Sequence, residues 1–228
     1  MTLGLQTWSE LAFFHWALPP EAVRPLVDPR LELDLFEGRA WVGLVPFTLN
    51  AARVRGLPPL PRFRQFHELN ARTYVRCGGA PGVWFFSLDA ASGPAAAVAR
   101  AAFGLPYHRA SIGRSSERDR FRYSSRRTWP SAPATFEATW SVGAPLAPYE
   151  LGSREHFLVH RLALYSRDFR GKLLRGVVEH PRWPLRVARL EHLTETVSRA
   201  AGLPPLIGEP LAHHSAGVNV EILRFEHV

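Results

Sequence analysis

Cysteine and lysine are each present only once in this chain, and each scarcity excludes a class of chemistry. With Cys77 alone, neither a disulfide framework nor a zinc or iron–sulfur site built from several thiolates can form. With Lys172 alone, the side chains offer a single primary amine. No apolar run approaches the roughly 18–20 residues of a membrane helix. The N-terminus lacks the basic start, apolar stretch and small-residue cleavage site of a secretory signal. We therefore expect a globular cytoplasmic protein without a membrane partner.

The composition is that of a folded protein, with 46% hydrophobic and 21% charged residues among 228. These values exclude disorder, collagen and coiled coil. No internal repeat, low-complexity tract or long linker divides the chain, so we predict a single domain spanning residues 1–228.

The positive charge is concentrated in two stretches of arginine. The net charge is +8, and residues 51–80 and 114–127 carry excesses of five and four positive charges, so the rest of the chain is about neutral. No helix-turn-helix, zinc-finger, RRM or KH pattern accompanies these arginines. We interpret them as a solvated surface and hold nucleic-acid contact as the less favoured alternative.

Short segments separated by proline and glycine predict a strand-dominated fold. Strands are predicted over residues 31–36, 39–49, 66–77, 83–88, 107–112, 120–128, 135–142, 162–166, 172–179 and 218–225. The turn Glu37-Gly38 predicts that the first two pair as a hairpin. Helices are predicted over residues 94–103, 153–160 and 190–201, the first capped by Ser92 or Gly93 and ended by Gly104. The expected fold is α+β, an antiparallel β-barrel or strongly bent sheet with a few packed helices.

The familiar catalytic and metal-binding motifs are missing. His156 and His160 have the i, i+4 spacing of helix-borne metal ligands, but no third ligand lies nearby in the sequence. We interpret the pair as a helix surface and expect neither a metal nor a cofactor. Cys77 has no neighbouring histidine, so it is interpreted as an incidental thiol rather than a nucleophile.

Two predicted strands place polar side chains in a row. Because side chains alternate along a strand, each row lies on one face. The rows are Glu68, Asn70, Arg72 and Tyr74 on one strand, and Phe121, Tyr123, Ser125 and Arg127 on the other. The pattern fits a solvent face and the wall of a small-molecule pocket equally well.

Motifs along nearly the whole chain resemble the YqjF-like family, a domain of unknown function. In order, they are Leu11-x-Phe13-x-His15-Trp16, Phe36-x-Gly38-x-Ala40-Trp41-Val42-Gly43, Glu68-x-Asn70-x-Arg72-Thr73-Tyr74-Val75, Gly82-Val83-Trp84-Phe85-Phe86-Ser87-Leu88-Asp89, Leu105-Pro106-Tyr107, Leu164-Tyr165 and Val178-x-His180-x-x-Trp183-Pro184-Leu185. That family is similar in fold to the acetoacetate decarboxylases. The resemblance implies a cone-like antiparallel β-barrel with an internal pocket.

The resemblance also implies that the decarboxylase chemistry is absent. Those enzymes carry a Gly-x-Pro-Lys-Lys element in which one lysine forms a Schiff base and its neighbour lowers the pKa of that lysine. In this chain Tyr107 and His108 occupy the matching positions, and neither can form an imine. Lys172 follows Gly171 in a predicted turn and is expected to be solvated. Glu68 resembles the pocket carboxylate of the decarboxylases.

Two functions follow as hypotheses, and the sequence leaves room for a homo-oligomer in both. The first is a binding module for a small anionic or carbonyl-bearing ligand. Its expected pocket residues are Asn70, Arg72, Tyr74, Trp84, Phe86, Tyr107, Tyr123 and Arg127, with the arginines supplying charge-assisted hydrogen bonds. The second is an acid–base enzyme in which Glu68 and His108 exchange protons and Arg72 stabilises developing negative charge.

Overall fold

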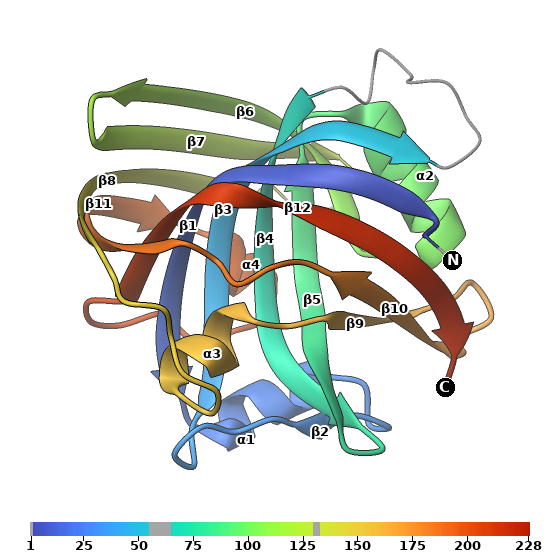
Figure 1. Cartoon of the computed structure of the whole chain (residues 1–228). Coiled ribbons are helices and arrows are strands. Elements are labelled where there is room, and N and C mark those ends of the chain that lie inside the picture. Colours follow the sequence, from blue (N-terminus) through green and yellow to red (C-terminus); the bar gives the residue numbers. More distant parts are fainter. Residues whose placement is uncertain (1, 55–64, 130–132) are drawn as a thin grey trace.

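One large sheet dominates the computed structural model, which describes residues 2–54, 65–129 and 133–228 (Figure 1). The 12 strands of the described residues are β1 Gly4–Leu18, β2 Glu32–Leu33, β3 Ala40–Val54, β4 Gln65–Cys77, β5 Ala80–Ala90, β6 Tyr107–Glu117, β7 Arg120–Trp129, β8 Thr135–Pro145, β9 Ala163–Arg167, β10 Leu173–Glu179, β11 Leu185–Glu195 and β12 Leu211–His227. Their order is β10-β9-β5-β6-β7-β8-β11-β12-β1-β3-β4-β2. The predicted strand-dominated α+β fold is confirmed.

The sheet bends round so that strands distant in this order meet. β4 also pairs with β5, and β10 also pairs with β12. The sheet therefore forms two partly closed rings that have one wall in common. This shared wall consists of β12, β1, β3, β4 and β5. The long arc runs through β6, β7, β8 and β11, and the short arc runs through β9 and β10. The seams are short: β5 joins β6 over three residue pairs and β9 over two, and these pairs are parallel.

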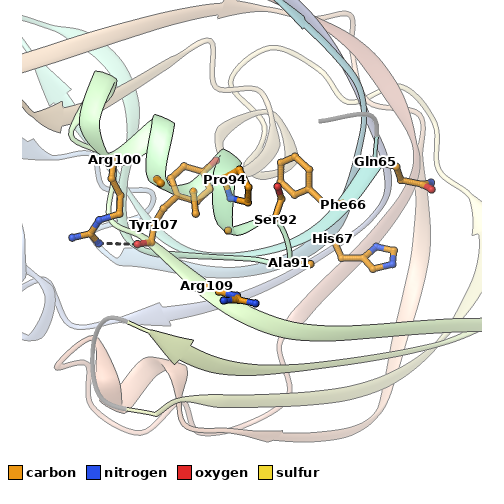
Figure 2. A pocket seen from close by; sticks show the side chains of 12 residues that line it. Gln65, Phe66, His67, Ala91, Ser92, Pro94, Arg100, Tyr107 and Arg109 are labelled. Atoms are coloured by element: carbon orange, nitrogen blue, oxygen red, sulfur yellow. Dashed lines mark hydrogen bonds between the residues drawn. The ribbon is translucent and has the colours of Figure 1, made fainter. Parts of the chain in front are cut away.

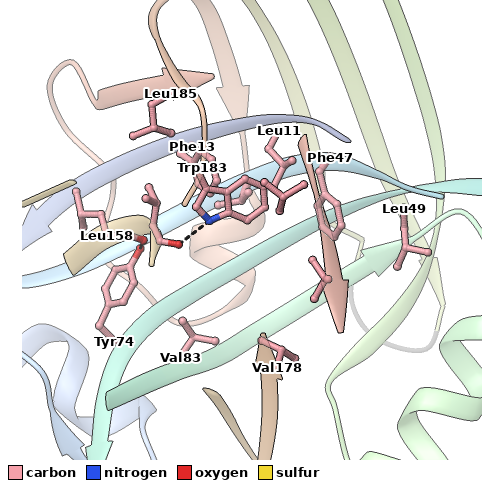
Figure 3. Packing of buried hydrophobic residues seen from close by; sticks show 14 of the residues in the cluster. Leu11, Phe13, Phe47, Leu49, Tyr74, Val83, Leu158, Val178, Trp183 and Leu185 are labelled. Atoms are coloured by element: carbon pink, nitrogen blue, oxygen red, sulfur yellow. Dashed lines mark hydrogen bonds between the residues drawn. The ribbon is translucent and has the colours of Figure 1, made fainter. Parts of the chain in front are cut away.

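The shared wall is buried on both faces. On β1, Leu11 and Phe13 belong to one hydrophobic cluster, whereas Ala12 and Phe14 belong to another. The first cluster lies on the short-arc side and includes Trp183, and Figure 3 shows part of its packing. The second faces the long arc and contains side chains of β7, β8 and β11. A strand buried on both faces has a nearly continuous apolar sequence instead of an alternating one.

The helices are few and short. They are α1 Pro20–Val23, a 3-10 helix over Arg24–Leu26, α2 Gly93–Phe103, α3 Arg154–Val159 and α4 Val197–Ala200. The caps predicted for α2 are confirmed, because the Ser92 hydroxyl accepts a hydrogen bond from the Ala95 amide and Gly104 ends the helix at φ 59°. In the described residues no helix has the length and apolarity to cross a membrane.

Two local predictions were wrong, and one strand was not predicted. Residues 31–36 do not form a hairpin with residues 39–49, because Glu32 and Leu33 pair with β4 and only an isolated Phe36–Arg39 bridge remains. Residues 190–201 are not one helix. Their first half belongs to β11, which pairs with β8, and only α4 is helical. Strand β1 was not predicted, because its second half, Leu11–Leu18, is buried on both faces and lacks the alternation that marks a half-buried strand.

Gly104 is the position at which the fold tolerates a side chain least. A Cβ there would lie 1.6 Å from the Arg167 carbonyl oxygen, in addition to the strain of φ +59°. Gly78 has a similar φ of +55° with no atom within 4 Å of the Cβ position. We expect Gly78→Ala to lower the free energy of unfolding by roughly 1–2 kcal/mol. Gly104→Ala should lower it by a further ~1–3 kcal/mol because of the clash. Urea unfolding of both variants tests this, and equal losses would contradict the importance of the Gly104–Arg167 contact.

Candidate functional site

The polar row of β4 faces the short-arc side of the shared wall. Glu68, Asn70 and Tyr74 are buried, and Arg72 is partly buried. The intervening Leu69 and Ala71 pack on the long-arc side. The sequence therefore predicted the shared face of this row correctly, and the row is interior and not a solvent face.

Glu68 is hydrogen-bonded to Tyr107, which the parallel β5–β6 seam brings close to it. The Tyr107 hydroxyl donates to Glu68 Oε2 over 2.9 Å, and Glu68 is only 3% exposed. Burial raises the pKa of Glu68 to about 8, opposed by the Tyr107 hydrogen bond and assisted by the charge of Asp89. Burial and the nearby Glu68 raise the pKa of Tyr107 well above its usual range. Near neutral pH the pair is therefore a protonated carboxyl beside a neutral phenol.

Tyr74 and Arg72 are attached to the end of α3. The Tyr74 hydroxyl donates to the Leu158 carbonyl over 2.7 Å, and Arg72 Nη2 donates to the same oxygen over 3.1 Å. His15 Nε2 lies 2.7 Å from the Tyr74 hydroxyl, so this nitrogen carries the proton that the hydroxyl accepts. Burial lowers the pKa of His15 well below its usual value, which keeps the imidazole neutral. The Tyr74 hydroxyl is thus fully hydrogen-bonded, whereas His15 Nδ1 and Arg72 Nε are buried without a hydrogen-bond partner among the described residues.

An open cavity of about 790 Å³ lies between α2 and the ends of β4, β5 and β6 (Figure 2). Its walls include Phe66, His67, Ser92, Arg100, Tyr107 and Arg109. Arg100 Nη1 donates to the Tyr107 carbonyl over 2.7 Å, which fixes the backbone at this point. Tyr107 therefore lines the cavity and contacts buried Glu68 at the same time. We call this the Tyr107 cavity.

Trp84 and Phe86 do not join Tyr107 in this cavity. They line a separate one of about 290 Å³, together with Gly104, Pro106 and Arg167. The backbone from Gly104 to Tyr107 therefore borders both cavities. The expected grouping of Trp84 and Phe86 with Tyr107 was wrong, because the two rings lie on the other side of this segment. We call the second space the Trp84 cavity.

Tyr123 and Arg127 lie on the long-arc side of the wall, although burial and the charges of Glu68 and Asp89 raise the pKa of Tyr123 well above its usual range. Arg127 Nε donates to Asp89 Oδ1 over 2.7 Å, with both side chains at most 4% exposed. Asp89 is opposite Leu69 in the β4–β5 register, so it faces away from Glu68. Phe121, Tyr123, Ser125 and Arg127 are all buried on one face, as predicted. The expected grouping of Tyr123 and Arg127 with Glu68 and Arg72 was wrong. Arg127 pairs with Asp89, which is in register with Leu69, and Leu69 points to the opposite face of β4 from its neighbour Glu68.

His108 lies on the opposite face of β6 from Tyr107. It is in register with Asp89, whereas Tyr107 is in register with Leu88. Burial and then the charges of Arg127 and Arg100 lower the pKa of His108 to about 4. Tyr107, not His108, is therefore the partner of Glu68.

Lys172 is exposed, as the sequence predicted. It lies beside the turn after β9, where its backbone amide donates a hydrogen bond to Asp168 Oδ1.

Sequence reasoning missed three participating residues. His15 belongs to the unpredicted β1, and Asp89 ends an apolar strand whose neighbours gave no sign of a buried ion pair. His180 joins the α3 histidines, with its ring centroid 5.1 Å from that of His160, which lies 5.3 Å from that of His156. Even so, the described residues contain no group of three or more ligating side chains placed to hold a metal.

Comparison with known proteins identifies relatives over nearly the whole chain. A model of the DUF2071 family, described as an uncharacterized conserved protein, matches residues 5–219. The uncharacterized protein YqjF of Bacillus subtilis is 38% identical over 210 residues, which cover 92% of this chain and 86% of YqjF.

Solved structures share the fold at low sequence identity. The enduracididine biosynthesis enzyme MppR, complexed with pyruvate, gives a TM-score of 0.70 at 14% identity, covering 100% of this chain and 91% of MppR. Acetoacetate decarboxylase from Legionella pneumophila gives 0.65 at 13% identity, covering 98% and 86%. An acetoacetate decarboxylase-like enzyme from Sphingomonas wittichii RW1 gives 0.66 at 11% identity, covering 100% and 94%. The expected decarboxylase-like fold is confirmed, and the sequence matches show that this chain belongs to the DUF2071 family.

Proposed function

We propose that this protein binds a small anionic or carbonyl-bearing metabolite in the Tyr107 cavity, without forming an imine. The observation that carries the proposal is that Tyr107 lines a cavity of about 790 Å³ while its hydroxyl is bonded to buried Glu68. This volume is within the usual range for small-molecule sites, which combine apolar walls with a few polar groups. Because the Tyr107 hydroxyl donates to Glu68, which does not line the cavity, a ligand carbonyl oxygen would replace Glu68 as the acceptor of this hydrogen bond.

The charge at the rim supports an anionic ligand. Arg100 and Arg109 line the Tyr107 cavity, and neither forms a side-chain ion pair with a carboxylate among the described residues. Arg100 is partly committed to the Tyr107 carbonyl, which leaves Arg109 as the freer cation. Pyruvate, present in the similar fold of MppR, combines a carboxylate with a ketone and is the natural first probe.

Acid–base catalysis is the second candidate function, and the raised pKa of Glu68 favours it. A carboxyl with a pKa near 8 can donate a proton at neutral pH and take one back. In this version of the enzyme hypothesis Tyr107 replaces His108 as the partner of Glu68. Arg72 is less suited to stabilise charge in this cavity than expected, because it donates to the Leu158 carbonyl.

Replacing Arg109 should weaken pyruvate binding. Loss of a charge-assisted hydrogen bond predicts an increase of about 10-fold in the dissociation constant for Arg109→Gln. Arg126→Gln is the matched control, since Arg126 is an exposed β7 arginine that does not line the cavity. Isothermal titration calorimetry measures both. Equal weakening by the two variants would indicate a general charge effect, and an absence of pyruvate binding to the wild type would count against pyruvate as ligand.

Glu68 should make stability fall as the pH rises. Its pKa is higher in the folded protein, about 8, than its ordinary value of 4.5, so folding favours the protonated form. The free energy of unfolding should therefore decrease between about pH 4.5 and pH 8, with a slope of up to ~1.4 kcal/mol per pH unit. Glu68→Gln removes this contribution and should be more stable than the wild type at pH 9.

The control for this experiment is Glu137→Gln, which alters an exposed carboxylate of β8. Urea unfolding between pH 5 and 9 gives the difference between each variant and the wild type. For Glu68→Gln that difference should grow with pH, whereas for Glu137→Gln it should stay nearly constant. A pH-independent difference for Glu68→Gln would mean that Glu68 is ionised in the folded protein.

The absence of imine chemistry can be tested directly. Tyr107 and His108 have no primary amine, and the chain's single lysine, Lys172, is exposed and does not line the Tyr107 cavity. Borohydride treatment with pyruvate or acetoacetate should therefore leave the intact mass unchanged. An adduct on Lys172 that Lys172→Arg abolishes would overturn this expectation.

A further inference from the structure

The Trp84 cavity has an unusual aromatic lining. Trp84, Phe86 and Tyr165 surround it with Leu26 and Pro106, and the first two rings remain partly exposed. Its volume of about 290 Å³ is at the small end of the range for ligand sites, so it suits a single ring. Aromatic side chains hold a planar ring through stacked or edge-to-face contacts.

Two arginines that share one aspartate lie at or near the edge of this cavity. Asp28 pairs with two arginines, Arg30 and Arg167, so one carboxylate faces two guanidinium groups. Arg167 lines the cavity, and its guanidinium carbon lies 5.6 Å from the centre of the Trp84 ring. Arg30 pairs with the same carboxylate but does not line the cavity. Arg167 donates to Asp28 through Nε, so a ligand carboxylate would approach the two Nη groups of this half-exposed side chain.

The Trp84 cavity is separate from the Tyr107 cavity. None of the residues that line one of them lines the other. The separating backbone is held from both sides, because the Pro106 carbonyl accepts a hydrogen bond from the Leu88 amide and the Phe103 carbonyl accepts one from the Ser166 hydroxyl. Access to one cavity through the other would require this segment to move.

We propose that the Trp84 cavity is a second ligand site, which takes a single aromatic ring bearing a carboxylate. The ring would lie against Trp84 and Phe86, and the carboxylate would approach Arg167. This site does not depend on the function proposed for the Tyr107 cavity, since it uses different residues and a different class of ligand.

Benzoate, benzyl alcohol and acetate separate the contributions of ring and charge. In NMR titrations we expect saturable binding of benzoate, binding of benzyl alcohol about 10-fold weaker, and no saturable binding of acetate. Absence of benzoate binding at millimolar concentration would overturn the proposal. Acetate binding as strong as benzoate binding would also overturn it, because the rings would then contribute nothing.

The two arginines on Asp28 provide a matched pair of variants. Their side chains are equally exposed, at 48%, and pair with the same carboxylate, but only Arg167 lines the cavity. Arg167→Gln should weaken benzoate binding about 10-fold and leave benzyl alcohol binding unchanged. Arg30→Gln should leave both unchanged. Equal effects of the two variants on benzoate would overturn the site, since they would reflect surface charge alone.

A third variant locates the ligand. Ala201, which is partly exposed and lines the Trp84 cavity, can be replaced by phenylalanine to fill the space. Ala201→Phe should abolish benzoate binding, while pyruvate binding to the Tyr107 cavity, where present, should persist. Loss of benzoate binding in Arg109→Gln with retention in Arg167→Gln would assign benzoate to the Tyr107 cavity and overturn the proposal. Circular dichroism confirms that each variant is folded, and Arg167→Gln decides the question if Ala201→Phe is not.

Discussion

Burial of the shared wall on both faces is the constraint on which the rest of this structure depends. A strand that is covered on one side can leave alternate side chains in water, but β1, β3 and β4 have no such side over much of their length. Any polar group placed there must find a partner inside the protein, because an unpaired buried group costs about 1–3 kcal/mol. The pairs Glu68–Tyr107 and Arg127–Asp89 meet this condition in part on opposite faces, since Asp89 Oδ2 and Arg127 Nη2 are buried without a hydrogen-bond partner among the described residues.

The same constraint determines the protonation of the candidate site. A buried carboxylate needs a cation within reach to remain ionised. Arg127 supplies that cation to Asp89, whereas the side chain that donates a hydrogen bond to Glu68 is the neutral Tyr107. Glu68 is therefore held protonated near neutral pH. The fold resembles that of the decarboxylases, and the side chain that donates to Glu68 in this chain is a tyrosine, which has no amine.

Local signals allowed part of this arrangement to be predicted. The caps of α2 and the alternation of β7 involve neighbouring residues, so the sequence alone predicts them correctly. The failures involve partners distant in the chain. The apolar spacing of residues 190–201 also fits a helix, and only the pairing of β11 with β8 makes residues 190–195 a strand. Tyr123 and Arg127 lie on the other face of the wall from Glu68 because of how β4 pairs with β5, β5 with β6 and β6 with β7, and the pattern within a single strand does not reveal these pairings.

The segment from Gly104 to Tyr107 borders both the Tyr107 cavity and the Trp84 cavity. Gly104 allows α2 to end against the Arg167 carbonyl, and no larger residue fits that approach. The chain then runs along β5, where Pro106 is hydrogen-bonded to Leu88, before Tyr107 turns toward Glu68. With both ends of the segment anchored, neither cavity can enlarge at the expense of the other without breaking backbone contacts. A ligand in one cavity would therefore influence the other only by displacing this backbone, and the fold makes such a displacement costly.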